Sequence, residues 1–124
     1  MTQIFDLQRP LIRALAIMAA IGCAALIAYG SLSPPDDVPS VTWSDKINHF
    51  IAYMCLSGPL LVAAGRERWL TMIALATAYG ALMELAQGTF DAGRTADLFD
   101  AIANGLGACA GVAIGYAMLS ASRS

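Results

Sequence analysis

The only histidine of the chain lies among polar residues at the start of an otherwise apolar segment. Asp45 and His49 are four residues apart, which is one turn of an α-helix. Lys46, His49 and Tyr53 follow one another at intervals of three and four residues, so a helix would place all of these side chains on one side. An imidazole beside a carboxylate is a common acid/base pair, and a lysine next to it could hold an anionic group.

Polar residues recur at helical spacing near one end of two further apolar segments. Glu84 is the sharpest case, because it follows 15 uncharged residues, and ionisable groups at membrane depth are costly and usually mark function. The two groups are Glu84 and Gln87 in one segment, and Asp97, Asp100 and Asn104, preceded by Arg94, in the other.

We interpret these residues as one polar pocket. The candidate acid/base residues are His49, Glu84 and Asp45. The candidate ligand-binding residues are Lys46, Tyr53, Gln87, Arg94, Asp97, Asp100 and Asn104.

The same residues also admit purely structural roles. Acidic side chains near helix starts can serve the helix cap and dipole, and basic ones can anchor at lipid headgroups. Glu84, Gln87 and Asn104 could form hydrogen bonds between helices.

We predict no cofactor and no metal site, because the spacing matches no known ligand motif. A divalent cation stays open as an alternative. Its donors would be one nitrogen and several oxygens, which suit Mg²⁺, Ca²⁺ or Mn²⁺ better than structural zinc. The donors would come from His49, Asp45, Glu84, Asp97 and Asp100.

The elements that must position these residues are apolar helices. The 124 residues are 58% hydrophobic and 13% charged, whereas soluble domains carry about a quarter charged residues. Four segments approach the roughly 20 apolar residues that cross a bilayer as a helix. The sequence therefore predicts one all-α domain over 1–124, an integral membrane four-helix bundle with helices at about 11–33, 45–65, 68–89 and 97–120. No basic tract with interleaved aromatics is present, so nucleic acid is not an expected partner.

Basic residues are unevenly distributed over the two sides that four helices would define. Five of them fall with the two termini and the second connection, and only two fall on the other side. The positive-inside rule then predicts a multi-pass protein of the cytoplasmic (inner) membrane with both termini in the cytoplasm. The polar pocket would face outward. The five are Arg9, Arg13, Arg66, Arg68 and Arg123, and the two are Lys46 and Arg94.

Two sequence features concern helix packing. Gly107, Gly111 and Gly115 recur every four residues, which lets another backbone approach closely. We expect this stripe to pack within the bundle, with a homo-oligomer as the alternative. Gly58-Pro59 lies inside the second helix and predicts a bend there. The cysteines lie in apolar runs, and we interpret them as packing residues.

The ordered polar motifs resemble those of the VanZ-like family of small membrane proteins, over about residues 25–116. The similar pieces are Ser31 to Pro34, Asp45-Lys46 with His49-Phe50 and Tyr53, Arg66, Glu84 with Gln87, and then Arg94, Asp97, Asp100, Asn104 and Gly107. The resemblance implies no defined activity. The family's namesake is associated with low-level resistance to the glycopeptide teicoplanin.

Our leading hypothesis is a membrane protein that binds, and could modify, an envelope lipid, a lipid-linked precursor or a glycopeptide-related ligand. Its partners would be membrane lipids and an anionic lipid-linked envelope precursor. The alternatives are a non-catalytic scaffold or assembly protein and a small transporter or proton-coupled permease. The sequence leaves open whether the protein is an enzyme.

Overall fold

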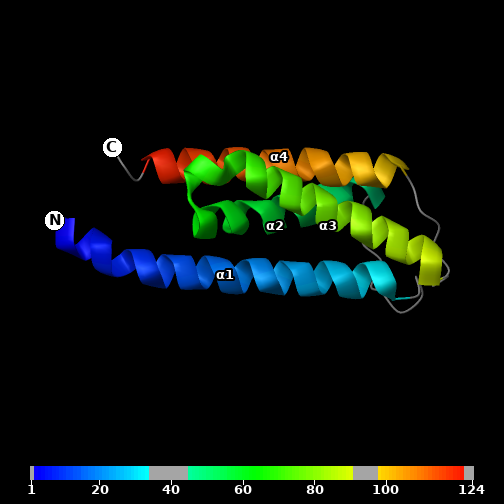
Figure 1. Ribbon diagram of the computed structural model, residues 1–124, viewed down its shortest axis with the longest axis horizontal. Coiled ribbons are helices and arrows are strands. Elements are labelled where there is room, and N and C mark those ends of the chain that lie inside the picture. The colour runs from blue at the N-terminus through cyan, green and yellow to red at the C-terminus, as the bar shows by residue number, and fades with distance from the viewer. Residues whose placement is uncertain (1, 34–44, 91–97, 122–124) are drawn as a thin grey trace.

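The computed structural model of the chain describes residues 2–33, 45–90 and 98–121 (Figure 1). Side chains are described for residues 9–33, 46–87 and 98–121. Within these ranges it is all-α and contains no strand. Its elements are α1 (Thr2–Leu32), α2 (Asp45–Ala64), the short 3-10 helix η2 (Arg66–Arg68), α3 (Trp69–Phe90) and α4 (Leu98–Ala121).

All four α-helices are long and apolar enough to cross a membrane. Large apolar side chains cover the outside of the bundle, and Leu26, Leu85 and Leu98 are each about two-thirds or more exposed. Outward-facing apolar side chains of this kind are stable only where lipid replaces water. The structure therefore confirms the predicted four-helix architecture and fits a multi-pass membrane protein.

The helices run side by side with alternating directions. Figure 1 shows that α1 begins and α4 ends at one end of the bundle, where α2 also connects to α3. The start of α2, the end of α3 and the start of α4 lie at the other end. The helix ends that carry the predicted polar residues are thus gathered at the end opposite the termini.

Of the described helices, α2 and α4 form the most extensive helix–helix contact, and the glycine stripe of α4 lies within it. Gly107, Gly111 and Gly115 are all buried in this seam. A Cβ at Gly107 would overlap the Phe50 carbonyl, and one at Gly111 would overlap the Ser57 hydroxyl. The absence of side chains lets the two backbones approach closely, as predicted for internal packing.

The seam also contains a buried hydrogen bond. Ser57 is fully buried, and its Oγ donates to the Ala108 carbonyl oxygen at 2.9 Å. A hydroxyl in an apolar interior must find such an acceptor, because its unmet desolvation cost is large.

Helix α2 passes through Pro59 without a break. Proline lacks an N–H, so the carbonyl of Cys55, four residues earlier, loses its helical donor. The Cys23 thiol of α1 lies 3.5 Å from that oxygen and donates to it. Cys23 therefore has a hydrogen-bonding role that the packing interpretation missed, whereas Cys55 and Cys109 expose their side chains.

Helix α1 is longer than expected. It begins at Thr2 rather than near residue 11, and it continues through Pro10. Proline costs a helix one hydrogen bond but keeps a helical φ, so it does not by itself end the helix.

Candidate functional site

The described polar residues at the end of the bundle opposite the termini come from three helices. Lys46 and His49 lie in the first turns of α2, Glu84 near the end of α3, and Asp100 and Asn104 near the start of α4. Lys46 lies half-exposed at the rim, and the two carboxylates and the amide are buried. We call these five residues the polar cluster.

Asp100 bridges two basic side chains with its two oxygens. Lys46 Nζ donates to Oδ1 at 2.7 Å, and His49 Nε2 lies 3.6 Å from Oδ2. The Asp100 side chain is 9% exposed, whereas that of Lys46 is 46% exposed. A buried carboxylate is stabilised by a charged partner at this distance.

The ring of His49 is oriented by Asn104. Its Nδ1 lies 2.7 Å from the Asn104 side-chain oxygen, which can only accept a hydrogen bond. With the amide placed this way, Nδ1 carries the proton and donates. The other nitrogen, Nε2, then faces Asp100.

Asn104 is almost completely buried, and its Nδ2 has no hydrogen-bond partner among the described residues. Gly80 of α3 lies against this amide, because a Cβ at Gly80 would come within 2.9 Å of Nδ2 and 3.1 Å of the Tyr53 ring. Sequence reasoning missed Gly80. The available signal was its position four residues before Glu84, on the same face of α3.

Glu84 and Gln87 both point inward from α3 and are buried, with 6% and 4% of their surface exposed. One donor atom each from His49, Glu84 and Asp100 lies within 4.8 Å of the other two. The predicted convergence of three helix ends is therefore present for these residues.

Tyr53 is buried and does not line an open pocket wall. It is 2% exposed and belongs to an apolar cluster with Leu56 and Ala108. Its ring packs against Tyr79 at 6.4 Å between centroids, and the Tyr79 hydroxyl donates to the Ala24 carbonyl at 2.6 Å. Tyr53 thus forms part of the apolar core.

For three predicted site residues the structure describes no side chain, and two of them, Arg94 and Asp97, lie outside the described part of the chain altogether. Arg94 and Asp97 precede α4, and Asp45 begins α2 without a described side chain. Their roles stay predictions.

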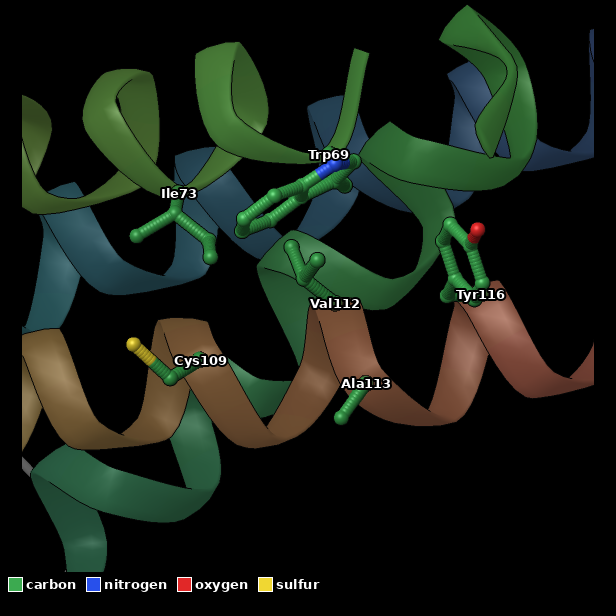
Figure 2. A pocket seen from close by; sticks show the side chains of 6 residues that line it. All are labelled: Trp69, Ile73, Cys109, Val112, Ala113 and Tyr116. Atoms are coloured by element: carbon green, nitrogen blue, oxygen red, sulfur yellow. The ribbon is translucent and has the colours of Figure 1, made fainter. Parts of the chain in front are cut away.

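The opposite end of the bundle carries a separate arrangement. Arg66 Nη1 donates to Ser120 Oγ at 3.0 Å, and the guanidinium lies 5.8 Å from the centre of the Tyr116 ring. Figure 2 shows an apolar groove between α3 and α4 in this half. Its volume is about 490 Å³, and it is lined by Trp69, Ile73, Cys109, Val112, Ala113 and Tyr116.

Comparison with protein families matches the chain to VanZ/LLP1 over residues 8–119. The chain therefore belongs to the VanZ/LLP1 family, and the match covers nearly all of it. No curated protein and no solved structure matches it significantly.

Proposed function

We propose that this VanZ/LLP1 protein binds the anionic headgroup of a membrane lipid or lipid-linked envelope precursor at the polar cluster. Lys46 would hold the phosphate, together with Arg94. His49 would act as acid or base if a reaction follows, oriented by Asn104 and by Glu84 or Asp45. Asp97, Asp100, Asn104 and Gln87 would position these groups. By the positive-inside rule, the cluster would face the outer side of the inner membrane.

The observation that carries this proposal is the burial of two carboxylates beside a half-exposed lysine. As whole residues, Glu84 and Asp100 are each 6% exposed. Buried charges at membrane depth cost several kcal/mol unless paired, and neutral hydrogen bonds such as that of Ser57 would join helices at less cost. Ionisable groups placed where neutral hydrogen bonds could join the helices support a ligand-binding role.

A second candidate function, a non-catalytic scaffold, is favoured by one observation. Lys46 pairs directly with Asp100, and His49 pairs directly with Asn104, so α2 and α4 are joined by side chains at this end. In that interpretation the polar cluster is a structural hydrogen-bond network between helices.

The transporter alternative receives less support. Acidic and basic residues of the described helices lie towards the two ends, with Lys46, Glu84 and Asp100 at one end and Arg66 and Arg68 at the other. A proton or ion path usually has such groups along its length. The middle of the described bundle has none.

The lipid proposal is tested with purified full-length protein kept in EDTA. Native mass spectrometry measures the retention of phosphatidylglycerol and a polyprenyl phosphate, with phosphatidylcholine as the neutral comparison. Lys46→Ala should lower retention of the anionic lipids about tenfold, because a charged hydrogen bond of roughly 1.5–3 kcal/mol is lost. Preference for the polyprenyl phosphate would indicate a lipid-linked precursor rather than a bulk lipid.

Arg66→Ala is the matched control, because it removes one positive charge at the opposite end. Thermal unfolding is measured on both variants. If Lys46→Ala lowers the unfolding temperature but retains anionic lipids like the wild type, the polar cluster is a structural network between helices and the lipid proposal is wrong.

A further inference from the structure

Three side chains of the polar cluster form a mixed nitrogen and oxygen donor set. His49, Glu84 and Asp100 come from α2, α3 and α4, and one donor atom of each lies within 4.8 Å of the others. The set combines one imidazole with two buried carboxylates and is not a patch of acids on a surface. Imidazole and carboxylate together are ligands for first-row divalent metals.

The spacing between His49 and Asp100 fits shared ligation better than a hydrogen bond. Nε2 and Oδ2 are 3.6 Å apart, beyond the 2.7–3.2 Å range of N–H···O bonds. Two ligands on one ion, each about 2.0–2.2 Å from it, lie roughly 3 to 3.5 Å from one another. A small movement of either side chain would bring both to a common ion.

The surrounding contacts orient both ligands. His49 Nδ1 lies 2.7 Å from the buried Asn104 oxygen, which can only accept, so Nε2 is the ring nitrogen on the side of Asp100. Asp100 uses Oδ1 to accept from Lys46 at 2.7 Å, and its Oδ2 faces the imidazole. Hydrogen bonds that fix the tautomer of a ligating histidine and hold a ligating carboxylate are the usual outer contacts of metal sites.

We propose that His49, Glu84 and Asp100 bind one divalent metal ion, Mn²⁺ or Zn²⁺, and that Asn104 is a positioning residue for it. Three protein ligands leave coordination positions for water or a phosphate oxygen. This site uses fewer ligands than the cation site considered from the sequence, because it includes neither Asp45 nor Asp97. It stands independently of lipid binding, which is tested in EDTA, and with the ion bound His49 would serve as a ligand in place of the acid/base role.

The test uses the full-length protein with Cys23→Ser, Cys55→Ser and Cys109→Ser, because free thiols would also take up zinc. Bound metal is removed with a chelator, and the protein is dialysed against MnCl₂ or ZnCl₂ and then against buffer. Its metal content is then measured by inductively coupled plasma mass spectrometry. About one equivalent per chain should remain. His49→Ala and Asp100→Asn should each lower the affinity at least tenfold, and Arg66→Gln should leave it unchanged.

Asn104 provides a sharper pair of variants. Asn104→Asp keeps an acceptor for the Nδ1 proton, so metal affinity should be retained or increased. Asn104→Leu removes the acceptor and should weaken binding by about 10- to 100-fold. Circular dichroism and size-exclusion chromatography identify the folded variants to be compared. If the folded parent protein takes up neither ion, or if His49→Ala and Asn104→Leu bind as tightly as the parent, the metal site is wrong.

Discussion

At the scale of single residues, the interior of this bundle is organised by polar atoms that need partners. Lys46 donates to Asp100, His49 Nδ1 lies beside the Asn104 oxygen, and Ser57 reaches a backbone carbonyl of α4. In lipid each such group must be satisfied inside the protein, since no water is available to replace a lost partner. Individual side chains therefore determine how neighbouring helices are rotated against one another.

The contact between Cys23 and the Cys55 carbonyl leads to a residue-scale prediction. Cys23→Ala should lower the free energy of unfolding by about 0.6 kcal/mol, a typical value for one interhelical hydrogen bond in a membrane protein. Cys23→Ser should keep the bond, because a hydroxyl is also a donor. Denaturant unfolding in mixed micelles measures the difference.

The control for this prediction is Pro59→Ala, which returns an N–H to α2 and gives the Cys55 carbonyl its helical donor. In that background Cys23→Ala should cost little. An equal cost in both backgrounds would show that Cys23 acts by packing alone.

At the scale of elements, the α2–α4 seam runs along the bundle and reaches the polar cluster. The glycines of α4 bring the helices into close contact, and the same contact places His49 beside Asn104. The seam therefore sets the geometry of the polar cluster, even though its glycines carry no polar side chain.

Gly111→Ala tests this seam. The new methyl group would overlap the Ser57 hydroxyl and the Met54 carbonyl, and backbone atoms cannot rotate away. We expect a loss of about 2 kcal/mol or more in the free energy of unfolding, in the range of other overpacked interiors. Thermal or denaturant unfolding measures it.

Gly105→Ala is the matched variant on the same helix. Its methyl group would meet Thr77 at 3.8 Å, an ordinary contact, so stability should be unchanged or slightly higher. Similar losses from both variants would contradict the close approach at Gly111.

At the scale of the whole molecule, an apolar exterior encloses a polar cluster at one end. The acidic and basic residues of the described helices lie towards the two ends of the bundle, and Arg66 contacts Ser120 and Tyr116 at the end near the termini. This distribution suits a protein held across a bilayer with its ionisable residues near the two surfaces.

The predicted orientation can be measured with reporter fusions. Alkaline phosphatase fused after Phe90 should be active, because the end of α3 would lie outside the cytoplasm. The same enzyme fused after Ala121 should be inactive, and a fluorescent protein there should fluoresce. We expect this orientation because five basic residues lie with the termini and the second connection, and only two lie on the other side. The reverse pattern would overturn the orientation and place the polar cluster on the cytoplasmic side.

The sequence by itself determined the architecture and the location of the candidate site. Apolar runs of membrane-spanning length specify helices, and short connections make successive helices alternate in direction. His49, Glu84 and Asp100 were therefore predicted to share one end, as the described structure shows.

Only the tertiary structure decided which of these residues meet. It paired Asn104 with His49, placed Tyr53 in the apolar core, and brought Cys23 to the carbonyl that Pro59 leaves without a donor. Hydropathy could not predict this, because lipid and protein interior are similarly apolar, and an apolar helix face does not reveal its own rotation. Close packing at the glycines and the need to satisfy each buried polar atom set that rotation instead.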